Sequence, residues 1–191
     1  MFRIIKWLIA LPLGAFIFFT AYVYGNIITY RAVAPNKTAF MAMRMRQFQS
    51  EGKDVALDYR WVPYDRISVN LKKALIASED AKFAEHGGFD WGGIQYAIKR
   101  NKQSGEVKAG GSTISQQLAK NLFLNESRSY IRKGEEAAIT AMMEAVTDKD
   151  RIFELYLNAF EWHYGIVGAD AASQYFVKRP AARLHKLTAA T

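Results

Sequence analysis

The hydrophobic pattern of the chain starts with one long apolar segment. No charged residue occurs from Trp7 to Tyr30, and the segment is rich in Leu, Ile and Phe. A helix needs about 20 such residues, at about 1.5 Å of rise each, to cross about 30 Å of hydrocarbon. Pro12 and Gly14 are compatible with such a helix. We therefore expect a transmembrane helix within residues 1–30.

The residues that flank this segment predict its orientation. Arg3 and Lys6 precede it, which by the positive-inside rule favours a cytoplasmic N-terminus and an exported remainder. Arg31 and Lys37 on the far side weaken that bias. A cleaved signal peptide is the alternative, because residues 32–34 (Ala-Val-Ala) resemble a cleavage site. The apolar run is longer than the 7–15 residues of the hydrophobic region of a typical signal peptide, so we favour an uncleaved anchor.

Beyond the anchor, apolar residues recur at helical spacing, and no segment alternates convincingly as a strand does. The fold is therefore predicted to be all-α, that is, predominantly helical. The expected helices cover about residues 38–49, 68–86, 91–100, 113–120, 129–147, 150–160 and 171–176.

Within the helix expected over 68–86, one carboxylate falls on the apolar stripe. Glu79 follows Leu75 by four residues and precedes Phe83 by four, so the three share a face. A carboxyl group buried there is costly to ionise, which raises its pKa as a general acid or base requires. A structural glutamate satisfied by a salt bridge is the alternative, and this stretch alone does not separate the two.

Composition narrows the classes of partner. The chain carries 26 Lys and Arg against 18 Asp and Glu, a net charge of +8. A basic exported domain next to a membrane faces anionic head groups and phosphates, whereas nucleic acid is a poor partner outside the cytoplasm. Cysteine is absent, which excludes disulfides and thiolate zinc sites, and the three histidines lack metal-binding spacing.

A possible anion site precedes the helix at 113–120. Gly110 and Gly111 stand before Thr113 and Gln116, which have the spacing of a capping box, and free N–H groups at such a helix start can bind an anion. Four cations follow at helix-compatible spacings, and they either grip a diphosphate or form an ordinary solvated face. These cations are Lys120, Arg128, Arg132 and Lys133.

The helix over 129–147 carries a second acidic candidate. Its apolar stripe includes Ile131 and Ile139, and Glu135 falls on that stripe while Glu136 falls beside it. Periodicity alone therefore predicts that Glu135 is the buried acid.

Four motifs together resemble the peptidoglycan glycosyltransferases, namely the monofunctional biosynthetic transglycosylases and the N-terminal module of class A penicillin-binding proteins. One anchor without a transpeptidase domain favours the monofunctional type. The motifs are Glu79-Asp80-x-x-Phe83-x-x-His86-x-Gly88, the run Gly110-Gly111-Ser112-Thr113-Ile114-Ser115-Gln116-Gln117-Leu118-x-Lys120-Asn121, Arg132-Lys133-x-x-Glu136, and Arg151-Ile152-x-x-x-Tyr156-Leu157-Asn158.

The resemblance implies a lysozyme-like fold with a small membrane-contacting lobe. It divides the chain into a cytoplasmic tip and anchor (1–30), a juxtamembrane lobe or linker (31–66) and a glycosyltransferase domain (67–191). It places the protein in the bacterial cytoplasmic (inner) membrane, with the catalytic domain on the periplasmic or outer face. Other proteins of cell-wall synthesis or division are implied as partners.

The implied reaction polymerises lipid II, the undecaprenyl-diphosphate-linked disaccharide-pentapeptide, into glycan strands with inversion. Glu79 matches the general base, and Glu136 matches the glutamate that organises the leaving-group site, through a divalent cation (Mg or Mn) or through the basic residues around it. The motif thus selects Glu136 over Glu135. Lys120 and Arg128 match diphosphate-binding positions. The positions that line the donor side are matched by Ser112, Gln116, Gln117, Arg132 and Lys133.

Two alternatives remain open at this point. Family members continue past the position of Leu187 and Thr188, so we expect a C-terminally truncated or partial chain, and an inactive scaffold that binds lipid II would fit that expectation. A lysozyme-like hydrolase or lytic enzyme also needs one buried glutamate on a helical scaffold. The cations from Lys120 to Lys133 argue against the hydrolase, because cleavage of a glycan offers no diphosphate to bind.

Overall fold

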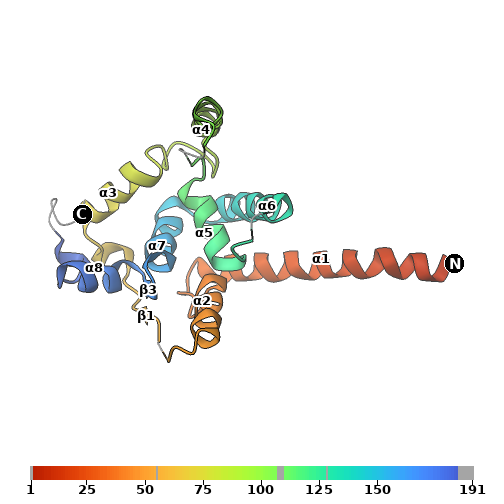
Figure 1. Ribbon diagram of the computed structural model, residues 1–191, viewed down its shortest axis with the longest axis horizontal. Helices are drawn as coiled ribbons and strands as arrows, with labels where there is room; N and C mark the ends of the chain where they lie inside the picture. Colours follow the sequence, from red (N-terminus) through yellow and green to blue (C-terminus); the bar gives the residue numbers. More distant parts are fainter. Residues whose placement is uncertain (1, 55, 107–109, 128, 185–191) are drawn as a thin grey trace.

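The computed structural model describes residues 2–54, 56–106, 110–127 and 129–184, and it is predominantly α-helical, as predicted (Figure 1). Two short 3-10 helices, η1 (Tyr64–Arg66) and η2 (Ala181–Arg183), accompany the α-helices. The α-helices are α1 (Phe2–Tyr30), α2 (Ala39–Ser50), α3 (Val69–Glu79), α4 (Trp91–Ser104), α5 (Ile114–Phe123), α6 (Tyr130–Val146), α7 (Lys149–Ala159) and α8 (Ala169–Val177).

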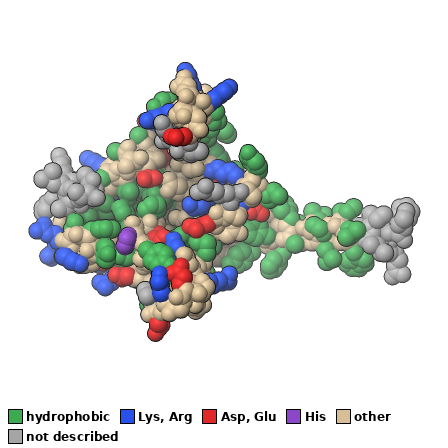
Figure 2. All heavy atoms as spheres, viewed as in Figure 1, with side chains coloured by type: hydrophobic (Ala, Val, Ile, Leu, Met, Phe, Trp, Pro, Cys, Tyr) green, Lys and Arg blue, Asp and Glu red, His purple; other side chains and the backbone are tan. Residues whose placement is uncertain are grey.

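Helix α1 projects from the rest of the molecule (Figure 1), and its segment Lys6–Tyr30 is long and apolar enough to cross a membrane. Hydrophobic side chains cover its described part where it leaves the domain (Figure 2). Near its C-terminal end, Val23 and Ile27 are buried, because α6 packs against α1 there. The helix is therefore both a candidate membrane span and part of the domain core.

The C-terminal end of α1 is held by one side chain from α7. Arg151 donates from Nε to the carbonyl oxygen of Tyr30 at 2.7 Å and from Nη2 to that of Val33 at 2.9 Å. Its guanidinium also lies 5.2 Å from the ring centre of Trp61. A cation suits this position, since the last carbonyl groups of a helix lack intrahelical partners and carry partial negative charge.

Helix α5 lies at the centre of the domain and packs against α2, α6 and α7. Ile114, Leu118 and Ala119 are fully buried on it. Its start has the predicted capping box: Thr113 Oγ1 accepts the Gln116 N–H at 3.2 Å, and Gln116 Oε1 accepts the Thr113 N–H at 3.1 Å. Local side-chain chemistry therefore fixes where this central helix begins.

A small three-stranded sheet, which the sequence pattern did not predict, joins distant parts of the chain. Its order is β1-β3-β2, with β1 (Asp58–Tyr59) parallel and β2 (Glu161–His163) antiparallel to β3 (Ile166–Val167). Strands of two or three residues are too short to show alternation.

The fully buried Asn158 ties the segment before η1 to α7. Its Oδ1 accepts the Val62 N–H at 2.8 Å, and its Nδ2 donates to the Val62 carbonyl at 2.9 Å. Because Asn158→Ala removes both partners of this backbone unit, we expect it to lower the free energy of unfolding by about 1–3 kcal/mol. Denaturant unfolding in detergent measures this loss. Exposed Gln49→Ala is the control, and equal stability of the two variants would contradict the assignment.

Candidate functional site

The candidate site is a cleft of about 410 Å³ where the end of α3, the start of α4 and the segment before α5 meet. Glu79, Ser112 and Tyr96 of α4 are among the residues that line it. The first and second of the recognised motifs thus come together in space, although Glu79 and Ser112 are more than 30 positions apart in the chain.

Glu79 is exposed in this cleft, so the prediction that it is buried on a helical stripe is wrong. Helix α3 ends at Glu79 instead of continuing to His86. Leu75 and Phe83 are both buried as expected, but Phe83 reaches the core from the turn that follows the helix. The core therefore does not remove the Glu79 carboxylate from water.

Asp80 explains why the helix stops. Its backbone leaves the helical conformation, with φ −162° and ψ 76°, and its buried carboxylate points to the start of α5. There Oδ2 accepts the Ile114 N–H at 3.1 Å, while Oδ1 lies 2.9 Å from His86 Nε2. A carboxylate at a helix start is electrostatically favourable.

Asp80 was not among the predicted site residues. Its place in the first motif, next to Glu79 and six residues before His86, is the sequence feature from which a role for it could have been predicted.

A hydrogen-bonded relay holds the Glu79 carboxylate. Gln117 donates from Nε2 to Glu79 Oε2 at 3.0 Å, and its Oε1 accepts the hydroxyl of Tyr156 at 3.2 Å. Tyr156 is fully buried in the core. Burial, with a smaller effect from the Glu79 and Asp80 carboxylates, raises the pKa of the Tyr156 hydroxyl well above its usual value. The hydroxyl therefore stays protonated and remains a donor.

A second carboxylate, Glu136, organises a group of cations beside the cleft. It is 3% exposed, and Arg132 Nη1 lies 2.7 Å from its Oε2. Lys133 Nζ binds its other oxygen and also donates to Ser112 Oγ at 3.0 Å. Ser112 therefore connects the lining of the cleft that holds Glu79 to a cationic network centred on Glu136.

Glu135 is exposed, so the prediction from periodicity was wrong, and the glutamate that is buried is Glu136, which the Arg-Lys-x-x-Glu motif selects. The stripe was misplaced because it included Ile131, which is 79% exposed. The buried residues of α6 are Glu136, Ile139, Thr140 and Met143.

The other predicted residues lie in different surroundings. Gln116 is buried and used in the helix cap, so it does not line the cleft. Lys120 follows Gln117 by three residues on α5, is half-buried, and pairs with no carboxylate among the described residues. Arg128 lies outside the described residues.

The divalent cation suggested by the resemblance does not fit the described residues. Both oxygens of Glu136 are already bound by Arg132 and Lys133. No group of three or more metal-ligating side chains occurs in the described part of the chain. Among the described residues, Arg132 and Lys133 supply the positive charge beside Glu136.

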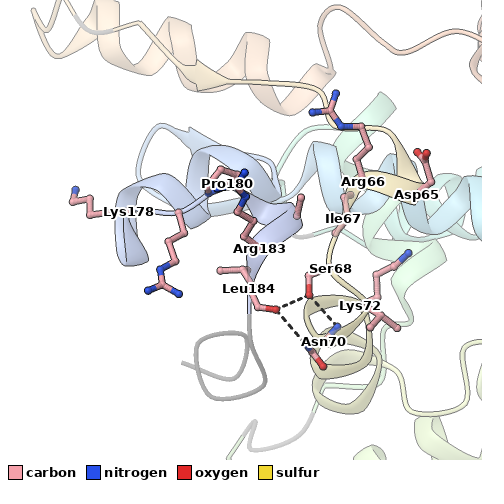
Figure 3. Close-up of a pocket in the computed structure, with 13 residues that line it drawn as sticks. Asp65, Arg66, Ile67, Ser68, Asn70, Lys72, Lys178, Pro180, Arg183 and Leu184 are labelled. Carbon is pink, nitrogen blue, oxygen red and sulfur yellow. Dashed lines mark hydrogen bonds between the residues drawn. The ribbon is translucent and has the colours of Figure 1, made fainter.

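A larger cavity, of about 910 Å³, lies at the other end of α3 (Figure 3). Arg66 and Lys72 flank it on one side and Lys178 and Arg183 on the other. Since α3 is 11 residues long, this cavity is about 15 Å from Glu79 along the helix. None of the predicted site residues that the structure describes lines it.

Comparison with known proteins identifies relatives over the full chain. Residues 45–191 match the model of the Transglycosylase family. A biosynthetic peptidoglycan transglycosylase of Neisseria meningitidis serogroup C (strain 053442) is 83% identical over 190 residues, which cover 100% of this chain and 82% of that protein. The protein of the same name from Neisseria gonorrhoeae (strain NCCP11945) is 82% identical with the same coverage.

These matches confirm the predicted fold class, since the transglycosylase domain is lysozyme-like. With the apolar helix α1, they also make this a membrane-anchored protein. The chain belongs to the transglycosylase family.

Proposed function

We propose that this chain polymerises lipid II into peptidoglycan glycan strands and releases undecaprenyl diphosphate. The names of its relatives and its family support this reaction. The observation that carries the proposal is structural: an exposed carboxylate, Glu79, shares a cleft with Ser112, which belongs to the cationic network around Glu136. A base and a site for an anionic leaving group are thus combined in one cleft.

Glu79 is proposed as the general base. Its carboxylate takes the proton from the 4-hydroxyl of the acceptor sugar, whose oxygen bonds to the anomeric carbon of the growing chain. The bond from that carbon to the diphosphate oxygen breaks on the opposite face, so the configuration inverts. Gln117 holds Glu79 Oε2, and no described residue donates a hydrogen bond to Oε1, which can accept the proton.

The cations are proposed to bind the diphosphate. Negative charge grows on the leaving oxygen as the bond breaks, so fixed positive charge there stabilises the transition state. Arg132 and Lys133 are held in place by Glu136, and Lys120 on α5 adds a third positive charge. Arg128 is assigned to the same group from the motif alone.

The two alternatives fit less well. A hydrolase would cleave a glycan without a diphosphate, and the network of Arg132, Lys133 and Glu136 would then have no ligand to match. A scaffold that only binds lipid II would have no need of a carboxylate held by Gln117 and exposed to the cleft.

The proposed location is the cytoplasmic (inner) membrane, with the catalytic domain on its outer face. Lys6 before the apolar segment supports a cytoplasmic N-terminus. The division into an anchor (1–30), a juxtamembrane lobe (31–66) and a catalytic domain (67–191) is part of the same proposal.

Glu79→Gln is expected to lower the rate of lipid II polymerisation by at least about 100-fold, because an amide cannot accept the proton. The amide keeps the shape of the side chain, so the melting temperature should stay close to that of the parent chain. Glu85→Gln, an exposed carboxylate six residues later, is the control and should retain full activity. Substantial polymerisation by Glu79→Gln would remove Glu79 from its proposed role.

The neighbouring glutamates of α6 offer a matched pair. Glu136→Gln leaves Arg132 and Lys133 without their counter-charge, and we expect kcat to fall by about 10- to 100-fold. Glu135→Gln should change kcat by less than about twofold, since that side chain is exposed. Steady-state kinetics with lipid II measure both variants, and equal effects of the two would contradict the leaving-group assignment.

A further inference from the structure

The start of α6 exposes two large apolar side chains that the proposed reaction does not use. Tyr130 is 98% exposed and Ile131 is 79% exposed. Among the described residues outside α1, no other large apolar side chain is as exposed as either. Single exposed apolar residues are common, but an adjacent pair with this exposure indicates a contact surface.

This pair lies on the helix that packs against the membrane anchor. Helix α6 contacts α1, and Figure 1 shows it on the side of the domain from which α1 leaves. The C-terminal end of α6 is close to the C-terminal end of α1, because Arg151, five residues after Val146, binds the Tyr30 carbonyl. From there α6 runs back along α1, so its first residues extend toward the bilayer.

The length of the apolar segment of α1 indicates where along this helix the bilayer surface lies. The segment Lys6–Tyr30 has 25 residues and is about 37 Å long, which exceeds the hydrocarbon thickness by about 7 Å. Only the last one or two turns can therefore lie outside the hydrocarbon. Ile27 lies about 4 Å and Val23 about 10 Å before Tyr30 along the helix, so Val23 is at the edge of the hydrocarbon, yet the domain buries both side chains. The part of the domain around them must reach the bilayer surface.

We propose that Tyr130 and Ile131 insert into the outer-leaflet interface of the bilayer that α1 spans. A tyrosine suits that depth, since its ring is apolar and its hydroxyl can reach the head groups. Arg132 and Lys133 follow directly, and cations are favourable near anionic lipid. The exposed acids Glu126 and Glu135 flank the same helix end and limit this attraction, so the apolar side chains supply the main contact.

One consequence rests on the proposed function. The diphosphate of a lipid-linked donor lies at head-group depth, and Lys133 is less than one helical turn from Tyr130. Insertion of Tyr130 and Ile131 would hold the cations around Glu136 at the height of the diphosphate, while the polyprenyl chain stays in the bilayer.

Labelling tests the insertion without reference to activity. The chain has no cysteine, so Tyr130→Cys and Ile131→Cys each introduce a single thiol. Phe176→Cys, at a 58% exposed position on α8, is the matched control. Each full-length variant is reconstituted into vesicles of phosphatidylethanolamine and phosphatidylglycerol. The rate of reaction with a membrane-impermeant maleimide is then divided by the rate for the denatured chain.

We expect the thiols at 130 and 131 to react at least about tenfold more slowly than the thiol at 176, because burial of one large apolar side chain shifts an equilibrium by more than tenfold. Equal rates at the three positions would overturn the proposal. Slow labelling that disappears when the chain is diluted in lipid would show contact between protein chains, which also overturns it.

A kinetic comparison tests the consequence for lipid II. In vesicles, the double variant Tyr130→Ser with Ile131→Ser should raise KM for lipid II several-fold with little change in kcat, and Tyr130→Trp with Ile131→Leu should restore it. An unchanged KM, together with slow labelling, would reject only this consequence. A parent chain that shows slow labelling but no polymerisation would reject the proposed function and leave the insertion intact.

Discussion

The geometry of the candidate site depends on the carboxylate of Asp80. By accepting the Ile114 N–H and pairing with His86, it ends α3 at Glu79 and joins that end to the start of α5. Glu79 is thereby left at the edge of a cleft, 3.0 Å from Gln117, which lies about one turn after the start of α5. Because α5 is the central buried helix, the rigidity of the core is transmitted directly to an exposed carboxylate.

The site uses two pairs of adjacent carboxylates, and in each pair the surroundings separate the roles. Glu79 is exposed and free to act on a substrate, whereas Asp80 is buried and holds backbone. In α6 the order is reversed, since Glu136 is buried between two cations and Glu135 faces solvent. Within α6, adjacent side chains point about 100° apart, so a shift of one residue decides which carboxylate meets the core, whereas Asp80 is turned inward because it has left the helix.

Features that depend on residues close together in the chain could be predicted from the sequence. They are the apolar anchor, most helices and the cap formed by Thr113 and Gln116. The end of α3 was not readable, because Asp80 is satisfied by a backbone group 34 positions later. The short sheet pairs Asp58 with Ile166 and was invisible for the same reason. Glu136 was found only through a motif, since helical periodicity favoured its neighbour.

The central claim is that one cleft couples a base to a diphosphate-binding site. The most direct measurement supplies the 191-residue chain, reconstituted in vesicles, with lipid II and follows both products. The account predicts glycan polymer and one undecaprenyl diphosphate released for each glycosidic bond formed. Soluble fragments released from preformed glycan, with no consumption of lipid II, would contradict it.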